Sequence, residues 1–180
     1  MKRKISLRNK VLNYLKRNQD RVFSTDEIRR KFKINKISDV VRGEFLSYLF
    51  IGNFYFYSYS NKIISDIYKN LRKFEIEALP LYIKQNLSAG YLLHYILNKH
   101  DRIFTSLEMK SEMRNYNFSR AAVGTALSNF CGSIIVEGRF FYGNREVLRA
   151  FKQKLQSRGI EYKERIAPSI IKISYRKRIL

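Results

Sequence analysis

The sequence is poor in the residues that cross-link chains, build metal centres or cross membranes. Cys131 is the single cysteine among 180 residues, which excludes an intramolecular disulfide and every zinc site built from several cysteines. There is no tryptophan, and no run approaches the 18 apolar residues that a transmembrane helix needs. The basic start of the chain is not followed by the apolar segment of a signal peptide. We therefore expect a cytoplasmic protein without a membrane partner.

Acidic residues are also scarce. The chain has 15 Asp and Glu against 36 Lys and Arg, a net charge of +21 at pH 7. Such an excess attracts polyanions and speeds their association. So few carboxylates leave little for a two-metal nuclease centre, and phosphate-loop, GxGxxG and HExxH motifs are missing. The composition favours a nucleic-acid-binding protein that is not an enzyme and uses no cofactor or metal.

The chain contains an internal repeat. The stretch DRVFST at 20–25 returns as DRIFTS at 101–106, and residues 11–49 align with 92–130 without a gap at an offset of 81. Tyr14 and Tyr95 form one of the identical pairs, and Phe23 and Phe104 form another. A repeat of this length suits a small domain better than a solenoid unit. We therefore predict one module that is present twice.

Both copies predict the same order of elements: helix, short strand, two helices, hairpin and a last helix. Capping boxes start the second helix, as Ser24-x-x-Glu27 in one copy and Thr105-x-x-Glu108 in the other. Good N-cap residues precede the third and fourth helices of each copy; these are Ser38, Ser119, Asn61 and Asn144. Gly52-Asn53 and Glu137-Gly138 provide the hairpin turns.

The segment SRAAVGTALSNF at 119–130 resembles the recognition helix of winged helix–turn–helix transcription regulators. It has a serine cap, a basic residue, several small residues and a Leu-x-x-apolar ending. As a pattern of elements, the resemblance covers most of both repeats. It implies an α+β fold that is mostly α with short β-hairpins, made of two winged helix-turn-helix domains in tandem. It also implies a third helix in the major groove and a wing against the adjacent DNA backbone.

The predicted boundaries place a first domain with a basic N-terminal arm at 1–74 and a linker at 75–90. The second domain covers 91–158, and a basic C-terminal tail covers 159–180. Within the linker, Pro80 is expected to end the long helix that leaves the first domain. The tail is expected to be either a docked strand or a segment that binds polyanions.

In the second copy, helical spacing predicts a buried face and a face of small residues on the third helix. The predicted outward residues are Ala121, Ala122, Thr125 and Ser128, with Arg120 at the N-terminal edge. Small side chains would let the helix backbone approach base edges, and Arg120 would bind guanine or phosphate. The alternative is that this face packs against another helix.

The first copy departs from this pattern. Its predicted third helix turns Val40, Val41, Glu44 and Tyr48 outward, a surface that suits a protein interface better than a groove lined by phosphates. Its second helix and the following turn are rich in Lys and Arg, which either clamp phosphates or form a solvated basic face.

The predicted nucleic-acid-binding residues come from both copies and both ends of the chain. They are Arg114, Asn115, Asn117, Ser119, Arg120, Thr125, Ser128 and Arg139 in the second copy, Arg29, Arg30, Lys33 and Lys36 in the first, and Lys2, Arg3, Lys4, Arg176, Lys177 and Arg178 near the ends. Alternating Tyr55, Tyr57 and Tyr59 in the first hairpin would stack on bases or pack within their own domain.

The favoured function is sequence-preferring binding to double-stranded DNA, in transcription regulation or in replication or partition of a genetic element. Such a protein would be associated with the nucleoid in the cytoplasm. One alternative is a structural RNA-binding protein associated with the ribosome, which would bind structured RNA. Another is a tandem winged-helix adaptor between proteins. A homodimer is compatible with each of these functions.

Overall fold

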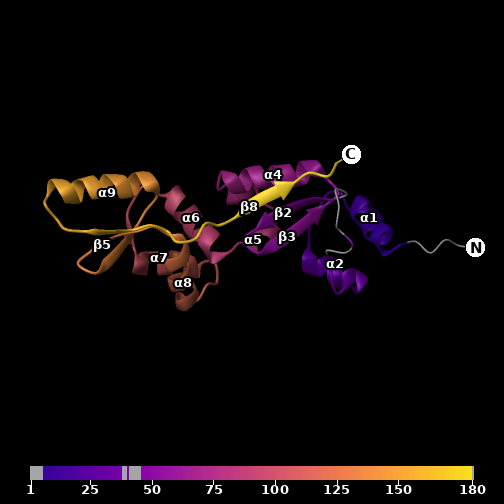
Figure 1. Ribbon diagram of the computed structural model, residues 1–180, viewed down its shortest axis with the longest axis horizontal. Coiled ribbons are helices and arrows are strands. Elements are labelled where there is room, and N and C mark those ends of the chain that lie inside the picture. The colour runs from indigo at the N-terminus through magenta and orange to yellow at the C-terminus, as the bar shows by residue number, and fades with distance from the viewer. Residues whose placement is uncertain (1–5, 38–39, 41–45, 180) are drawn as a thin grey trace, which may run out of the picture. The chain divides into compact units, whose positions relative to one another are not determined.

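The computed structural model describes residues 6–37, 40 and 46–179. The chain forms two units: unit 1 comprises Met1–Lys84 and Lys172–Leu180, and unit 2 comprises Gln85–Ile171. Each unit is α+β, with helices packed on an antiparallel sheet of four strands (Figure 1). The last residues of the chain thus return to unit 1 as a strand, which confirms the docked-strand alternative for part of the predicted tail at 159–180.

The described elements of unit 1 follow the predicted order, except that most of the predicted third helix lies outside the described residues, and they add a strand from the end of the chain. They are α1 (Leu7–Arg17), β1 (Phe23–Ser24), α2 (Thr25–Phe32), β2 (Ser47–Ile51), β3 (Phe54–Ser58), α4 (Asn61–Arg72), the 3-10 turn η1 (Ile76–Ala78), α5 (Leu81–Lys84) and β8 (Ile173–Arg176). The capping box at the start of α2 is confirmed: the Ser24 hydroxyl accepts from the amide of Glu27, whose carboxylate accepts from the amide of Ser24.

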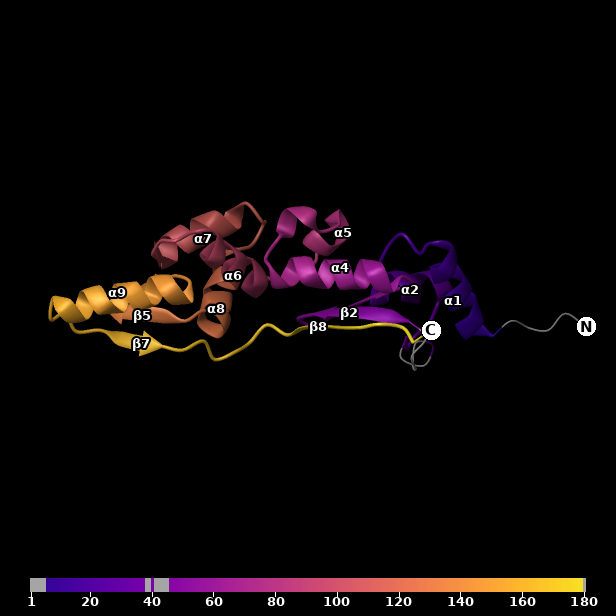
Figure 2. The same ribbon diagram turned by 90° about the horizontal axis from the view of Figure 1, so that it is seen from above.

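The sheet of unit 1 has the order β1-β3-β2-β8. Helix α4 lies along one face of β2 and β8, as Figure 2 shows. Leu49, Ile51 and Phe56 alternate with outward residues, and each is at most 1% exposed. Gly52 has a φ of 60° in the β2–β3 turn, a conformation in which glycine avoids the clash that a Cβ would cause.

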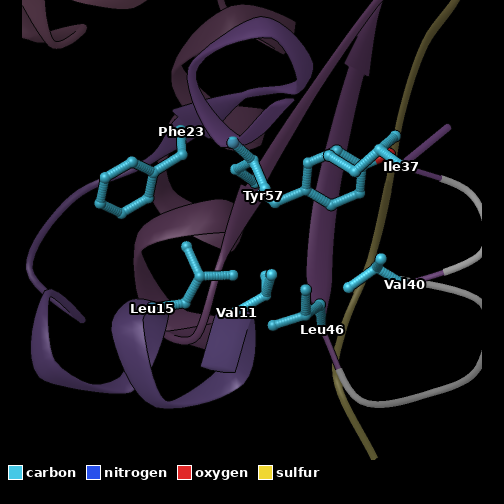
Figure 3. Packing of buried hydrophobic residues seen from close by; sticks show 8 residues of the cluster. Val11, Leu15, Phe23, Ile37, Val40, Leu46 and Tyr57 are labelled. Carbon is cyan, nitrogen blue, oxygen red and sulfur yellow. The ribbon is translucent and has the colours of Figure 1, made fainter. Parts of the chain in front are cut away.

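One hydrophobic cluster joins the two N-terminal helices of unit 1 to its sheet (Figure 3). Val11 and Leu15 of α1 pack there with Phe23 and Tyr57 of the sheet. Val40 belongs to the same cluster and is only 8% exposed, so the prediction that it faces outward is wrong. Burial of a valine side chain in this cluster is favoured because it removes apolar surface from water.

The predicted third helix of the first copy, 38–49, wrongly includes three residues of a strand. Ser47, Tyr48 and Leu49 belong to strand β2, not to a helix. Leu49 faces Phe56 as Ile134 faces Phe141 in unit 2, so the offset between the units is 85 in the hairpins and not 81. The aromatic and aliphatic side chains of SYLFI alternate between the sheet faces, which favours a strand. Ser38, the predicted cap, lies outside the described residues.

Unit 2 repeats this order. Its elements are α6 (Ala89–Lys99), β4 (Phe104–Thr105), α7 (Ser106–Arg114), α8 (Arg120–Phe130), β5 (Ser133–Val136), β6 (Arg139–Tyr142), α9 (Arg145–Ser157) and β7 (Lys163–Arg165). The sheet order β4-β6-β5-β7 matches that of unit 1 strand for strand. Thr105 and Glu108 form the predicted capping box of α7.

Both ends of one helix, α4, differ from their predictions. Asn144 caps α9 as predicted, but Ser60 caps α4, and Asn61 is the first residue of that helix. Helix α4 ends at Arg72, before Pro80, and the carbonyl of Pro80 instead accepts from Ile83 in the first turn of α5. Across the described ranges, no helix combines the length and apolar character needed to cross a membrane.

Candidate nucleic-acid interface

Helices α7 and α8 of unit 2 are joined by a tight turn that contains several predicted contact residues. The turn starts with Asn115, the C-cap of α7, and Asn117 adopts a left-handed conformation with a φ of 62°. Asparagine tolerates this conformation better than most residues. Ser119 then caps α8, because its hydroxyl accepts from the amide of Ala122 at 3.2 Å. Five residues, 115–119, thus separate the end of α7 at Arg114 from the start of α8 at Arg120.

Helix α8 has one buried and one exposed face, as predicted. Val123, Ala126 and Leu127 are at most 6% exposed and pack in the core of unit 2. Ala121, Ala122 and Thr125 are exposed on the other face. The described part of unit 2 therefore does not cover the small-residue face, so the alternative that it packs against a helix of its own unit is wrong.

A close contact with α6 fixes the other side of α8. A Cβ atom on Gly90 of α6 would lie 2.7 Å from Cδ2 of Phe130, so only glycine permits this approach. The contact of half-buried Phe130 with α6 orients α8 with its small residues toward solvent. Packing within unit 2 thus determines that the small-residue face of α8 points toward solvent.

The exposed face of α8 is positively charged at its N-terminal end. Arg114, Asn115, Asn117, Ser119 and Arg120 are all exposed. The stretch 113–136 contains no Asp or Glu. The N-terminus of α8 adds the positive end of the helix dipole, which attracts phosphate.

Three predicted contact arginines of unit 2 form no salt bridge among those in the described residues. The salt bridges there involve Arg21, Arg29, Arg102 and Lys152. Arg114, Arg120 and Arg139 take part in none of them. A guanidinium without a carboxylate partner can bind phosphate or guanine without first breaking an ion pair.

The sequence analysis did not predict two further cations next to α8, Lys110 and Arg165. The Cε atom of Lys110 would lie 4.0 Å from a Cβ on Gly124, which places this lysine beside the exposed face. Its position one helical turn before Arg114 on α7 was the signal that could have revealed it. Arg165 of β7 donates to the carbonyl of Ser128 near the C-terminal end of α8. That contact joins residues distant in sequence, and only the tertiary structure shows it.

Ser128 is less available than predicted. Its side chain is half-buried, and its carbonyl is engaged by Arg165. Arg139 lies just after the β5–β6 turn and is exposed. In that turn Glu137 and Gly138 both have positive φ, at 48° and 78°, as a two-residue type I′ turn requires.

The predicted phosphate clamp of unit 1 lies at the end of α2. Arg29, Arg30 and Lys33 line an open hollow of about 560 Å³ together with Asp26, Ile34 and Asn35. Nη1 of Arg29 lies 3.8 Å from the Asp26 carboxylate, a long and exposed ion pair that contributes little. Lys36 is also exposed. The hollow thus combines three cations with one carboxylate.

The predicted cations near the two ends of the chain differ in their structural surroundings. Lys2, Arg3 and Lys4 lie outside the described residues. Arg176 belongs to β8, and its guanidinium carbon lies 4.9 Å from the centre of the Tyr48 ring. The Arg178 guanidinium lies 4.0 Å from the centre of the Tyr59 ring, while Lys177 is exposed. Arg176 and Arg178 are thus fixed on unit 1 and do not form a free tail.

The interface predicted for the first copy is not formed as expected. Val40 is buried, and Tyr48 is a half-buried strand residue whose ring lies 5.6 Å from that of Tyr55. Val41 and Glu44 lie outside the described residues. The error arose because the register of the repeat changes before β2, so helical spacing did not apply to Tyr48.

Two groups with potential for acid–base or metal chemistry, Cys131 and His94, lie at the C-terminal end of α8. Burial raises the pKa of the Cys131 thiol to about 12 and lowers the pKa of His94, whose Nε2 lies 2.8 Å from the carbonyl of Phe130. Within the residues that the structure describes, no three His, Cys, Asp or Glu side chains are placed to hold a metal ion.

Comparison of the chain with protein-family models, with curated proteins and with solved structures gives no match in any of the three. The function is therefore inferred from the residues and geometry of the chain itself.

Proposed function

We propose that this protein binds double-stranded DNA through two winged helix–turn–helix units in tandem. The observation that carries the proposal is the exposed face of α8, where Ala121, Ala122 and Thr125 follow Arg120 within a stretch free of carboxylates. Small side chains allow the helix backbone to approach base edges in the major groove, and an arginine fork pairs with guanine. In this proposal α8 reads sequence.

The arrangement around α8 supports this role. Unit 2 has the order helix, strand, helix, helix and hairpin, and its sheet has the order β4-β6-β5-β7. A recognition helix followed by a hairpin would place exposed Arg139 against the phosphates beside the groove. Lys110 and Arg114 of α7 would contact phosphates on the other side of the turn.

Unit 1 would hold the DNA backbone without reading bases. Arg29, Arg30 and Lys33 gather around one hollow, and phosphate contacts made by such a cluster are independent of sequence. With Val40 in the core, the exposed valine pair that favoured a protein–protein adaptor is lost. Transcription regulation and the replication or partition of a genetic element both need this combination of a reader and a clamp.

Selection of bound fragments from random duplex DNA at physiological salt tests the proposal. We expect a consensus sequence, and we expect the logarithm of the affinity to fall by about 0.9 per phosphate neutralised for each decade of salt. A preference for structured RNA over duplex DNA at matched salt, or the lack of any consensus, would overturn the proposal.

A matched pair of variants tests the division of roles. Arg120→Ala should reduce the ratio of consensus to scrambled-duplex affinity by about five-fold or more, the value of one bidentate base contact. Arg30→Ala should weaken both duplexes equally and leave the ratio unchanged. Equal loss of preference in the two variants would contradict the assignment of α8 as the reader.

A further inference from the structure

The sheet of unit 1 has a second face, opposite to α4, that is rich in aromatic side chains. In the strand register Tyr48 faces Tyr57, Phe50 faces Tyr55, and Arg176 faces Tyr48 from the other side. Residues that face each other across strands point to the same side of a sheet. Tyr175 contacts Tyr68 of α4 with ring centres 4.3 Å apart, so its neighbour Arg176 points away from α4. We call Tyr48, Phe50, Tyr55, Tyr57 and Arg176 the aromatic face.

The rings of the aromatic face contact one another. The Tyr55 ring centre lies 4.7 Å from that of Phe50 and 5.6 Å from that of Tyr48. Tyr55 and Tyr57 are stacked with 14° between their planes. The guanidinium of Arg176 covers Tyr48 at 4.9 Å. These contacts hold the side chains in place, so a ligand that binds them would cost little additional ordering.

The members of the aromatic face differ in exposure. Tyr57 is 7% exposed because it enters the hydrophobic core, whereas Tyr55 is 43% exposed and Arg176 is exposed. Phe50 and Tyr48 are half-buried. The accessible part of the face therefore combines the Tyr55 ring and the Arg176 guanidinium with part of Phe50.

The strands that form this face carry no negative charge. Residues 45–65 and 165–180, which include β2, β3 and β8, contain no Asp or Glu. Lys172 and Lys177 lie at the two ends of β8 and are exposed. A polyanion would thus meet cations along β8 without repulsion from carboxylates on the same strands.

We propose that the aromatic face of unit 1 binds single-stranded nucleic acid, with an unpaired base stacked on Tyr55 and the strand's phosphates on Arg176 and Lys172. Aromatic rings offer stacking to any base, and cations beside them hold the backbone. In a duplex the base faces are already stacked on each other, so this site requires unpaired nucleotides. It is distinct from the duplex-reading role of α8 and does not depend on it.

Unit 2 offers an internal comparison. Its hairpin places Phe140 and Tyr142 in the register of Tyr55 and Tyr57, and their rings are also nearly parallel, at 15°. Ile135 stands where unit 1 has Phe50, and Ser133 stands where it has Tyr48. Lys163 and Arg165 pair with these two residues, so the cations are kept while two aromatic rings are lost. The same face is thus less aromatic in unit 2. We expect unpaired bases to prefer unit 1.

The test compares two labelled oligomers of about 12 units at matched salt: oligothymidylate and an abasic deoxyribose-phosphate chain of the same charge. Fluorescence anisotropy with the full-length protein should show that thymidylate binds at least about five-fold more tightly, since stacking adds to phosphate binding. Equal affinity for the two oligomers would overturn the proposal, because charge alone would explain the binding.

Substitutions then locate the site. Tyr55→Leu should remove most of the preference for thymidylate, Tyr55→Phe should retain it, and Phe140→Leu is the matched control in unit 2. Thermal unfolding of each variant confirms that the sheet is intact, and the leucine keeps apolar bulk where an alanine would leave a gap. Unchanged thymidylate binding by Tyr55→Leu, or an equal loss in Phe140→Leu, would contradict the proposal.

Arg120→Ala separates this site from the proposed duplex function. We expect this variant to lose duplex preference while it retains the affinity for oligothymidylate. Loss of thymidylate binding in Arg120→Ala would contradict a separate site on unit 1. If the wild type selects no consensus sequence in duplex DNA but still binds thymidylate more tightly than the abasic chain, only the proposed function is contradicted.

Discussion

The backbone amide of Arg178 donates to Oδ1 of Asn61 at 2.7 Å, and the amide nitrogen of Asn61 donates back to the carbonyl of Arg178 at 3.0 Å. Oδ1 of Asn61 also accepts from the Ser47 hydroxyl. One side chain at the start of α4 thus binds the first residue of β2 and the residues that follow β8. The end of the chain is held in unit 1 by these bonds and by the β2–β8 ladder.

Asn61→Ala should therefore destabilise the docking of β8. The variant loses bonds to two backbone groups and a hydroxyl that are part-buried, which we expect to cost about 1–3 kcal/mol. Hydrogen exchange should show faster exchange in β8 and β2 than in the wild type. Lys62→Ala, at an exposed neighbouring position, is the control and should leave exchange unchanged. Unaltered protection of β8 in Asn61→Ala would show that the ladder alone holds the strand.

Gly124→Ala should separate stability from DNA binding. A Cβ at this position would meet only Lys110, at 4.0 Å, so the fold has room for it. Alanine should raise the stability of unit 2 by about 0.5–1 kcal/mol, since it is a better helix former. If α8 approaches base edges closely, the added methyl group should lower duplex affinity in an anisotropy titration. A variant that is more stable and binds duplex DNA as tightly as the wild type would contradict close approach at Gly124.

The capping box of α7 predicts a loss of stability in acid. Hydrogen bonds from the Thr105 amide and hydroxyl, together with Arg102, lower the pKa of Glu108 below its ordinary value of 4.5. A carboxylate with a lowered folded-state pKa stabilises the fold above its unfolded pKa, and the contribution is lost as pH falls through the folded value. Thermal unfolding of wild type and Glu108→Gln should therefore converge as pH falls below 4.5. A constant difference across that range would rule out this linkage.

The Cys131 thiol should react slowly in the folded protein. Its pKa of about 12, raised by burial, leaves almost no thiolate near neutral pH, and the side chain is 1% exposed. Mass spectrometry after iodoacetamide treatment should show little alkylation in buffer and rapid alkylation in denaturant. The labelling rate would then report on opening of unit 2. Alkylation in buffer as fast as that of free cysteine would contradict the buried position.

Local patterns in the sequence were sufficient for much of the fold. Both capping boxes, the cap of α8 and its buried face were predicted, because a few neighbouring residues fix a helix start and a helix face. The alternation of Tyr55 and Tyr57 on one strand face was likewise predicted from a period of two. These features depend on short-range hydrogen bonds and on side-chain spacing.

The offset between the two copies in the hairpins and the position of the C-terminal strand depended on contacts between distant residues. The predicted turns at Gly52-Asn53 and Glu137-Gly138 already differ by 85, but only the strand pairing showed that Tyr48 lies beyond the change from an offset of 81. The burial of Val40 likewise depended on the packed cluster. The exposed small-residue face was confirmed, but the positions of Lys110 and Arg165 beside α8 required the packing of unit 2.

The sequence by itself determined a strongly basic chain that repeats one α+β module, because composition, caps and periodicity are properties of neighbouring residues. Only the tertiary structure decided that β8 returns to complete the sheet of unit 1 and that Arg176 lies on Tyr48. Strand pairing is set by the competition of every exposed edge for backbone hydrogen bonds, and that competition involves the whole folded chain.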